Sequence, residues 1–287
     1  MLERSCYILY MNKLSQEKQI QIIQALVEGN SIRSTSRMTG AAQGTILTLL
    51  QRVGEACEAY QAEHLRGLTC RRIQCDEIWS YCHSKEKNVP KEHKGEAGFG
   101  DVYTWTALDA DNRLMVSWVV GKRSPAHADA FIADLKSRIV NRPQITTDGY
   151  APYFTAVEKA FGENVDFAII RKSYGTDAYP KGRYSPAYVV GAKKENVVGY
   201  PIKAHISTSY VERQNLTMRM SMRRFTRLTN AFSKKIEKLQ AAVALHFMYY
   251  NYVRVHKTLG STPAMAAGLT TKIWAISDLI DFIDKSN

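Results

Sequence analysis

Three acidic residues stand where their position calls for a chemical explanation. Asp76 interrupts the apolar, strand-like run RRIQCDEIWSYC, Asp148 follows a short strand-like segment and precedes Gly149, and Glu212 begins a long helical stretch. A carboxylate inside an apolar strand is costly unless a partner or a metal ion neutralises it. Oxygen ligands are those that Mg²⁺ prefers, and two such ions can promote phosphodiester cleavage and strand transfer. We therefore treat Asp76, Asp148 and Glu212 as candidate catalytic and metal-binding residues.

Each acid also has an ordinary structural interpretation. Asp76 can be a buried ion-pair partner, Asp148 a turn residue, and Glu212 an acid stabilised by a helix N-terminus. Taken singly, these interpretations explain the residues equally well, and only the order of the elements favours convergence. Glu77 neighbours Asp76 but is expected on the opposite face of its strand, so we exclude it from the metal site.

The elements that must position these acids follow from the periodicity. A period of two predicts a strand from Arg71, and two further strands and a helix starting at Ser124-Pro125 follow. The rest of the order is a strand at 144–147, a helix at 152–161 and a strand at 166–170. This order, with three antiparallel strands first, predicts an α/β RNase H-like core with a mixed sheet and flanking helices. Asp76 then lies on the central strand, Asp148 ends the strand beside it, and the helix of Glu212 crosses the sheet.

Residues 14–65 are predicted to be helical. A helix, a short helix, a tight turn and a third helix indicate an all-α helix-turn-helix, with Gly40 as the small residue where two helices approach. A plain three-helix packing unit is the alternative, and the basic chain favours DNA binding. The candidate DNA contacts here are Arg33, Arg37, Gln43, Thr45 and Thr48.

A row of cations follows Glu212. At about 100° per helical residue, Asn215, Leu216, Arg219 and Arg223 share the side of Glu212. No acid recurs before Glu237, which favours a helix that presents cations to a DNA strand over a merely solvated face. Met218, Met220, Met222 and Phe225 are expected to pack against the sheet. The candidate DNA contacts of this segment are Arg213, Asn215, Arg219, Arg223, Arg224 and Arg227.

The whole-chain composition narrows the partners. The sequence has 39 Lys and Arg against 27 Asp and Glu, a formal charge of +12, which favours a polyanion. Five unevenly spaced cysteines indicate a reduced compartment, and buried thiols are favoured over a zinc site at Cys70, Cys75, Cys82 and His83. Since no run of about 18 apolar residues occurs, we expect a cytoplasmic protein without a membrane partner.

The segments CDEIWSY, TTDGYAPY and HISTSYVERQNLTMRMSMRRFT resemble bacterial and archaeal insertion-sequence transposases of the DDE type. The resemblance is strongest to the family named after insertion sequence one, and it extends from about Cys75 to the PAMAAGL segment. It implies that Asp76, Asp148 and Glu212 are the three acids in order. It further implies two Mg²⁺ ions, replaceable by Mn²⁺, cleavage at element ends, joining of the 3′-hydroxyl to target DNA, and homo-oligomers on paired ends. The zinc-binding segment that often precedes the helix-turn-helix in this family has no counterpart here.

The sequence therefore predicts a helix-turn-helix domain at 1–68, a DDE catalytic domain at 69–255 and a tail at 256–287. Residues 175–205 are a possible insertion. The expected function is metal-dependent transposition, with inverted-repeat ends and target DNA as double-stranded partners, in a prokaryotic, nucleoid-associated setting. A catalytically inactive or domesticated DNA-binding regulator, and a nuclease of the same fold that cuts without joining, are the alternatives.

Overall fold

The computed structural model describes residues 14–175, 189–226 and 229–285. Its contacts divide the chain into two compact units. The sheet unit comprises Leu65–Tyr81 and Asp101–Leu216, and the helical unit comprises the described parts of Met1–His64, Cys82–Gly100 and Thr217–Asn287. Each unit is described by itself.

The sheet unit is built on a six-stranded mixed sheet with the order β3-β2-β1-β4-β5-β6. β4 is parallel to both β1 and β5, whereas β2–β3 and β5–β6 are antiparallel. The predicted mixed sheet is confirmed, with β1 in its middle and β4 beside it. The strands are β1 (Arg72–Cys82), β2 (Gly100–Asp109), β3 (Met115–Gly121), β4 (Gln144–Thr147), β5 (Asp166–Tyr174) and β6 (Val189–Val198).

β6 lies in the segment 175–205 that sequence patterns left unassigned. It pairs with β5 at the edge of the sheet, and nearly all its residues are exposed. Burial therefore imposes no alternation on it, which is why its sequence carries no strand signal. Residues 176–188 of the possible insertion lie outside the described part of the chain.

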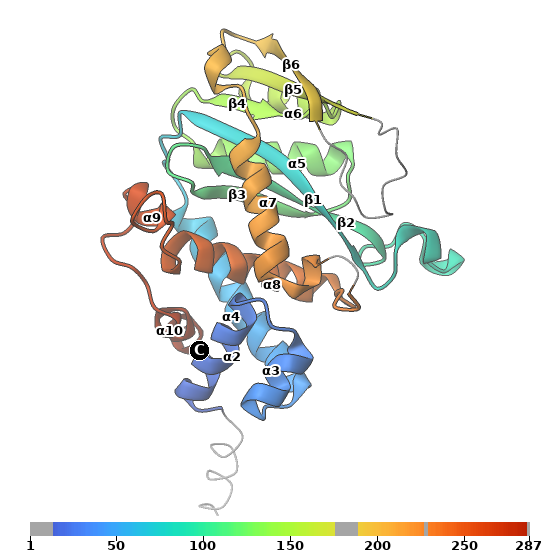
Figure 1. The fold of residues 1–287 in the computed structure, drawn as a ribbon, viewed down its shortest axis with the longest axis vertical. Coiled ribbons are helices and arrows are strands. Elements are labelled where there is room, and N and C mark those ends of the chain that lie inside the picture. The colour runs from blue at the N-terminus through green and yellow to red at the C-terminus, as the bar shows by residue number, and fades with distance from the viewer. Residues whose placement is uncertain (1–13, 176–188, 227–228, 286–287) are drawn as a thin grey trace, which may run out of the picture. The chain divides into compact units, whose positions relative to one another are not determined.

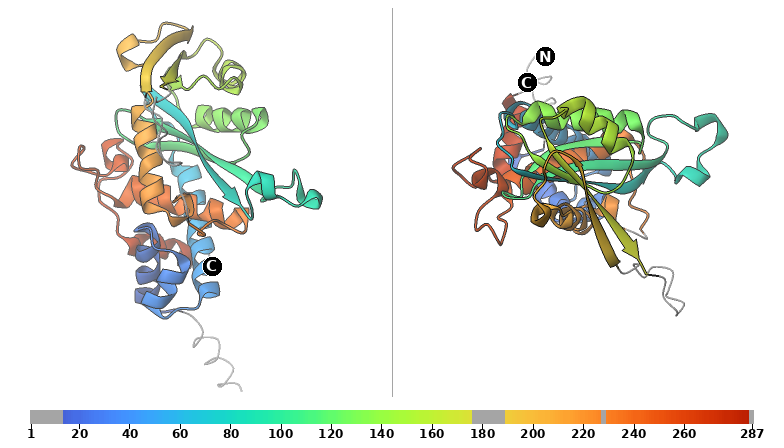
Figure 2. Two further views of the ribbon diagram at one scale, coloured as in Figure 1. Left: turned by 45° about the vertical axis from the view of Figure 1, so that its right-hand side comes forward. Right: turned by 90° about the horizontal axis from the view of Figure 1, so that it is seen from above.

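Helices cover both faces of the sheet. α5 (Pro125–Arg138) and α6 (Pro152–Phe161) lie on one face, and α7 (Ser209–Ser221) crosses the other (Figures 1 and 2). α5 begins as predicted, with Ser124 as N-cap and Pro125 in its first turn. The core under α5 and α6 is aromatic, and its fully buried rings include Trp105, Phe131 and Tyr153.

α7 is shorter than predicted. The sequence places a break near 228–231, but the helix ends at Ser221, Met222 is extended, and a 3-10 turn η4 (Arg223–Phe225) follows. Met222 and Phe225 are both buried, so this early turn directs two apolar side chains into the core. Met218 is buried as expected, whereas Met220 is 69% exposed, so the prediction that all four apolar side chains pack was wrong for Met220.

The helical unit combines N-terminal and C-terminal helices. A Cβ added at Gly54 of α4 would lie 2.3 Å from the carbonyl oxygen of Ala241 in α8, so glycine permits the close contact of these two helices. Gln61 of α4 also donates to the Ala244 carbonyl over 3.2 Å. The helices are α2 (Gln16–Val27), α3 (Ile32–Thr39), α4 (Gln43–His64), α8 (Ile236–Met248), α9 (Pro263–Ala266) and α10 (Ile276–Lys285), with a π-helical turn η5 (Tyr249–Val253) after α8 and the short turns η1 (Glu86–Asn88) and η2 (Lys91–His93).

The reason for a glycine in the turn between α3 and α4 differs from the predicted one. A Cβ at Gly40 would meet nothing within 4 Å, so close helix approach does not require glycine there. Gly40 instead adopts a left-handed conformation, φ 73°, as the C-cap of α3. Backbone conformation, rather than space, therefore explains this residue.

The described cysteines are ordinary core residues. Cys57, Cys70, Cys75 and Cys82 are free and buried. Across the ranges that the structure describes, no helix has both the length and the apolar character needed to cross a membrane.

Candidate active site

The pairing of β1 with β4 brings two of the three acids to one level of the sheet. Gln74 pairs with Thr146 in this parallel ladder. Asp76 lies two residues beyond Gln74, and Asp148 lies two residues beyond Thr146. Because residues two apart share a face of a strand, the two carboxylates rise from neighbouring positions.

Gln74 holds the start of α7 against β1. Its buried side-chain oxygen accepts hydrogen bonds from the backbone N–H groups of Tyr210 at 2.8 Å and Val211 at 3.1 Å. These N–H groups belong to the first turn of the helix, where backbone N–H groups have no acceptor within the helix. Glu212 follows directly, so Gln74 sets its position. Sequence analysis did not name Gln74 as a site residue, although its spacing of two from Asp76 was the available signal.

Asp76 meets the same helix one turn later. The Asn215 Nδ2 atom donates to Asp76 Oδ2 over 2.8 Å, while the other amide atom, Oδ1, is buried without a hydrogen-bond partner. Asn215 was predicted to contact DNA, but the structure buries it against the first acid. It therefore orients the Asp76 carboxylate.

Glu212 is half-exposed, and its carboxylate is engaged from two sides. Thr208 Oγ1 donates to Glu212 Oε1 over 2.5 Å, and the Lys172 ammonium on β5 forms an ion pair with the same oxygen. No sequence pattern pointed to Lys172, because β5 and α7 are distant in sequence.

Asp148 shapes the turn after β4. Its Oδ1 accepts from the Tyr150 N–H over 2.9 Å, and its Oδ2 lies 3.5 Å from Nη2 of Arg123. The ordinary turn interpretation of Asp148 is therefore correct, but it does not use both oxygens. A Cβ at Gly149 would come within 3.2 Å of the Arg171 guanidinium, so a second arginine passes this turn.

Glu77 lies nearer to this site than expected. Its buried carboxylate shares Arg123 with Asp148, at 3.5 Å from Nη2 to each. Arg123 in turn stacks over the Tyr150 ring at 3.9 Å. Burial first and Asp148 second raise the pKa of Glu77 to about 7, against the lowering effects of Tyr153 and Arg123. Glu77 was expected on the opposite face of β1 from Asp76. It is nevertheless linked to the second acid, Asp148, because both carboxylates pair with Arg123.

Two of the predicted acids act on the third electrostatically. Burial first, and then the negative charges of Asp148 and Glu212, raise the pKa of Asp76 to about 6. The Glu77 N–H and Asn215 lower this pKa, since they hydrogen-bond to the ionised form. A negative cluster of this kind is stabilised by a cation placed among its members.

The donor set suits a hard divalent cation. It offers carboxylate oxygens from three elements and the unpartnered amide oxygen of Asn215. As the side chains stand, no three His, Cys, Asp or Glu residues of the described ranges are close enough to hold one ion. Arg123 and Lys172 occupy two of the carboxylates in this arrangement.

The predicted DNA contacts separate into groups. Arg33, Arg37, Gln43, Thr45 and Thr48 are exposed on α3 and the start of α4. Arg213 is exposed on α7, and Arg219 lies near its end. The predicted row fails at Arg223, because α7 ends at Ser221 and places Arg223 and Arg224 on η4. Arg227 lies outside the described residues.

Comparisons with known proteins give the following. No protein-family model matches the chain, and no curated protein is significantly similar to it. Among solved structures, the Mos1 strand transfer complex is 13% identical over 54% of this chain and 58% of that chain, with a TM-score of 0.24. The Mos1 transposase paired-end complex is 10% identical over 54% and 59%, with a TM-score of 0.23. The chain thus spans under two thirds of the Mos1 proteins. The synaptic complex of piggyBac transposase with hairpin DNA is 10% identical over 96% and 73%, with a TM-score of 0.38.

Proposed function

We propose that this protein is a DDE-type transposase, which cleaves DNA at transposon ends and transfers the strand into target DNA. The observation that carries the proposal is that Asp148, at the end of β4, and Glu212, on α7, both act on the pKa of the buried Asp76 on β1, which places the three acids in one region of the sheet unit. The YVERQN and TTDGY segments, which resemble the family named after insertion sequence one, contain Glu212 and Asp148.

The proposed fold assignments follow from the element order. The β3-β2-β1-β4-β5 part of the sheet, with α5 and α6 in sequence after β3 and β4, supports an RNase H-like core. The three helices α2, α3 and α4 support a helix-turn-helix, in which the exposed polar start of α4 reads DNA.

Asp76, Asp148 and Glu212 are the residues that would hold Mg²⁺, or Mn²⁺ in its place. Two bound ions would activate the attacking oxygen and neutralise the charge on the leaving oxygen. Burial first, and then repulsion from Asp148 and Glu212, raise the pKa of Asp76, and bound cations would relieve that repulsion.

The side chains around the acids have separate jobs. Asn215 orients the Asp76 carboxylate, and Gln74 keeps the first turn of α7 in place. Arg123 and Lys172 neutralise Asp148 and Glu212 in the arrangement seen here. If these acids held metal, Arg123 and Lys172 would be free to pair with a DNA phosphate.

The proposed reaction has two displacements at phosphorus. In cleavage, a water oxygen bonds to the phosphorus, the bond to the 3′-oxygen breaks, and a 3′-hydroxyl is left with the transposon end. In joining, that 3′-hydroxyl attacks a target phosphodiester and displaces the 3′-oxygen of the target strand. The proposed partners are accordingly transposon ends and target DNA, held by a homo-oligomer on paired ends in the cytoplasm.

Incubation of the purified protein with Mg²⁺ and a DNA carrying the flanks of its own gene tests this proposal. Cleavage followed by joining is expected for the unaltered protein and is expected to vanish in Asp76→Asn, Asp148→Asn and Glu212→Gln. Cutting retained in any of these variants overturns the site assignment. DNA carrying a pre-formed 3′-hydroxyl end separates a transposase from a nuclease, because only the former joins it. Binding without cutting by the unaltered protein would indicate the regulator.

A further inference from the structure

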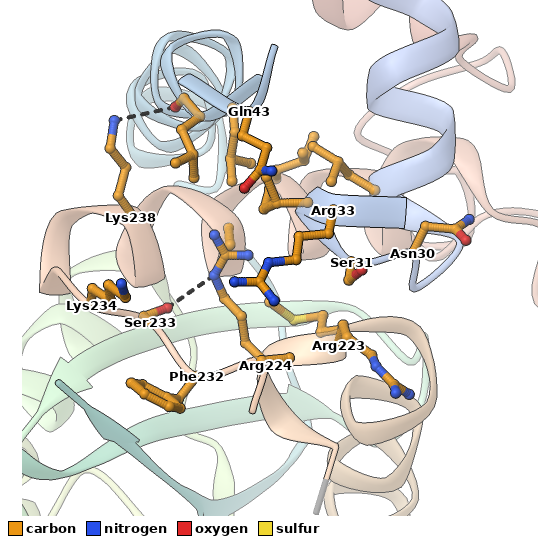
Figure 3. A pocket seen from close by; sticks show the side chains of 18 of the residues that line it. Asn30, Ser31, Arg33, Gln43, Arg223, Arg224, Phe232, Ser233, Lys234 and Lys238 are labelled. Atoms are coloured by element: carbon orange, nitrogen blue, oxygen red, sulfur yellow. Dashed lines mark hydrogen bonds between the residues drawn. The ribbon is translucent and has the colours of Figure 1, made fainter. Parts of the chain in front are cut away.

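The helical unit contains a groove that the three acids do not explain. Its volume is about 1030 Å³, and it lies between the starts of α3 and α4 and the segment that runs from η4 to the start of α8 (Figure 3). Both helix starts therefore contribute to its wall, and helix N-termini favour negative charge.

The charge of this groove is one-sided. None of the described residues that line it is Asp or Glu. The basic residues that line it are Arg33, Arg223, Arg224, Lys234, Lys235 and Lys238. Lys238 is tied to α4, since its ammonium donates to the Leu47 carbonyl over 3.2 Å and contacts the Gln51 side chain. For the other basic lining residues, the described part of the groove offers no acid as a partner.

Arg224 is the central cation. Its Nε donates to Ser233 Oγ over 2.9 Å, and the Ser233 carbonyl is itself fixed by the His83 N–H over 2.8 Å. No carboxylate of the described residues forms an ion pair with Arg224. Burial lowers its pKa to about 10, so it remains charged at neutral pH. Arg33 and Arg224 both line the groove, and Figure 3 labels them on the two sides of it. Like charges that line one groove are stabilised by an anion bound in it.

We propose that this groove binds the sugar–phosphate backbone of DNA, with phosphates received by Arg33, Arg224 and Lys234. The inference deepens the proposed function, since it takes DNA as the partner. A backbone fits better than a single small anion because the cations are spread along the groove and because Gln43 and Thr48 of α4 line it as well. Two stretches that the sequence suggested separately, the start of α4 and the arginines after α7, thus form one binding surface, which Lys234 and Lys235 extend.

The test compares two double variants that remove the same charge. Arg33→Gln/Lys234→Gln alters exposed residues of the groove, whereas Arg52→Gln/Lys87→Gln alters exposed residues of the same unit outside it. Binding is measured by fluorescence anisotropy over a salt series, in EDTA, with a duplex of about 25 base pairs and with an oligo-dT strand of the same length. We expect the groove variant to bind about tenfold more weakly and its salt slope to fall by nearly 2, at about 0.9 per lost phosphate contact.

The outcomes separate cleanly. Equal losses in both variants, or unchanged affinity in the groove variant, overturn the proposal, and so does a loss of self-association in place of DNA affinity. A loss with either probe supports it, and the probe that is affected more identifies duplex or single strand as the form bound. Because the binding titrations contain EDTA, DNA affinity is measured without divalent metal and without cleavage. A failure to cleave DNA therefore counts against the proposed function and leaves the proposal of DNA binding in the groove unaffected. Melting temperatures confirm that both variants are folded.

Discussion

The carboxylate cluster of the sheet unit and the basic groove of the helical unit differ in whether their charged side chains have partners of opposite charge. Around the acids, Arg123 pairs with Asp148 and Lys172 with Glu212, while the neutral amide of Asn215 donates a hydrogen bond to Asp76. In the groove, no described lining residue offers an acid to Arg33 or Arg224. Carboxylates that pair with internal cations can exchange Arg123 and Lys172 for other cations. A groove whose cations have no acid among its lining residues needs an anion from outside. The first suits chemistry and the second suits affinity.

The same contrast extends to buried titratable groups. Burial raises the pKa of Asp76 to about 6 in the sheet unit, and burial followed by Arg254 lowers the pKa of His246 to about 3 in the helical unit. Both shifts favour the neutral form, so acidic conditions are expected to affect the two units with opposite sign. The predictions below begin with the largest expected effect.

Asp76→Asn should reduce the rate of DNA cleavage by at least about a thousandfold. The change removes a proposed ligand of the metal ions that would neutralise charge in the transition state. The same change should stabilise the metal-free protein. The folded pKa of Asp76 lies above its unfolded value, so its stability contribution is present in acid and lost as the pH rises through about 6. Removing the charge at pH 8 should therefore raise the free energy of unfolding by up to about 3 kcal/mol. Thermal melts with and without Mg²⁺ check this.

In that experiment Mg²⁺ should raise the melting temperature of the unaltered protein more than that of Asp76→Asn. A variant that loses both stability and activity would point to a structural role for Asp76 and would weaken the proposed distinction between the two regions.

His246 should make the helical unit sensitive to acid. Its folded pKa lies below its unfolded value of about 6.5, so the unfolded chain takes up a proton that the folded chain refuses as the pH falls from about 6.5 to about 3. Over that window the free energy of unfolding should fall by up to about 4 kcal/mol. His246→Leu should flatten this dependence, as measured by urea unfolding at several pH values. An unchanged slope in the variant would contradict the assignment.

Gln74→Leu should lower cleavage by about tenfold or more and the free energy of unfolding by about 1–3 kcal/mol, because two N–H groups of α7 lose their buried acceptor. Ser80→Ala is the matched control. Ser80 is buried on the same strand and donates to the Val102 carbonyl, away from the acids. It should cost stability without a selective loss of cleavage rate. If both variants lose the same cleavage rate for the same loss in free energy of unfolding, Gln74 does not position Glu212.

Lys172→Met should have the smallest effect. Glu212 is about two-fifths exposed, so its ion pair with Lys172 is worth at most about 1 kcal/mol. Its removal should lower the Mg²⁺ concentration needed for half-maximal binding by up to about fivefold, because Glu212 no longer has a competing cation. Cleavage at saturating Mg²⁺ should nevertheless fall, since Lys172 is then missing for the phosphate. Weaker Mg²⁺ binding in the variant would argue against exchange of partners at this site.

Local patterns predicted much of the fold. Alternation indicated β1, the Ser124-Pro125 pair marked the start of α5, and 152–161 coincides with α6. Patterns failed where the forces are not local. β6 is an exposed edge strand without alternation, and α7 ends at Ser221 with no glycine or proline to announce it. There the turn buries Phe225, and burial is a property of the tertiary structure.

The sequence by itself determined which acids to consider, the order of the elements that contain them and the cationic character of the chain, because residue type and periodicity are local properties. Only the tertiary structure decided which side chains meet. The contact of Gln74 with Tyr210 joins residues 136 positions apart, and that of Asn215 with Asp76 joins residues 139 apart. Arg33 and Arg224 come to one groove from separate helices and turns. Such pairs arise from sheet register and helix packing, and no pattern within one segment contains that information.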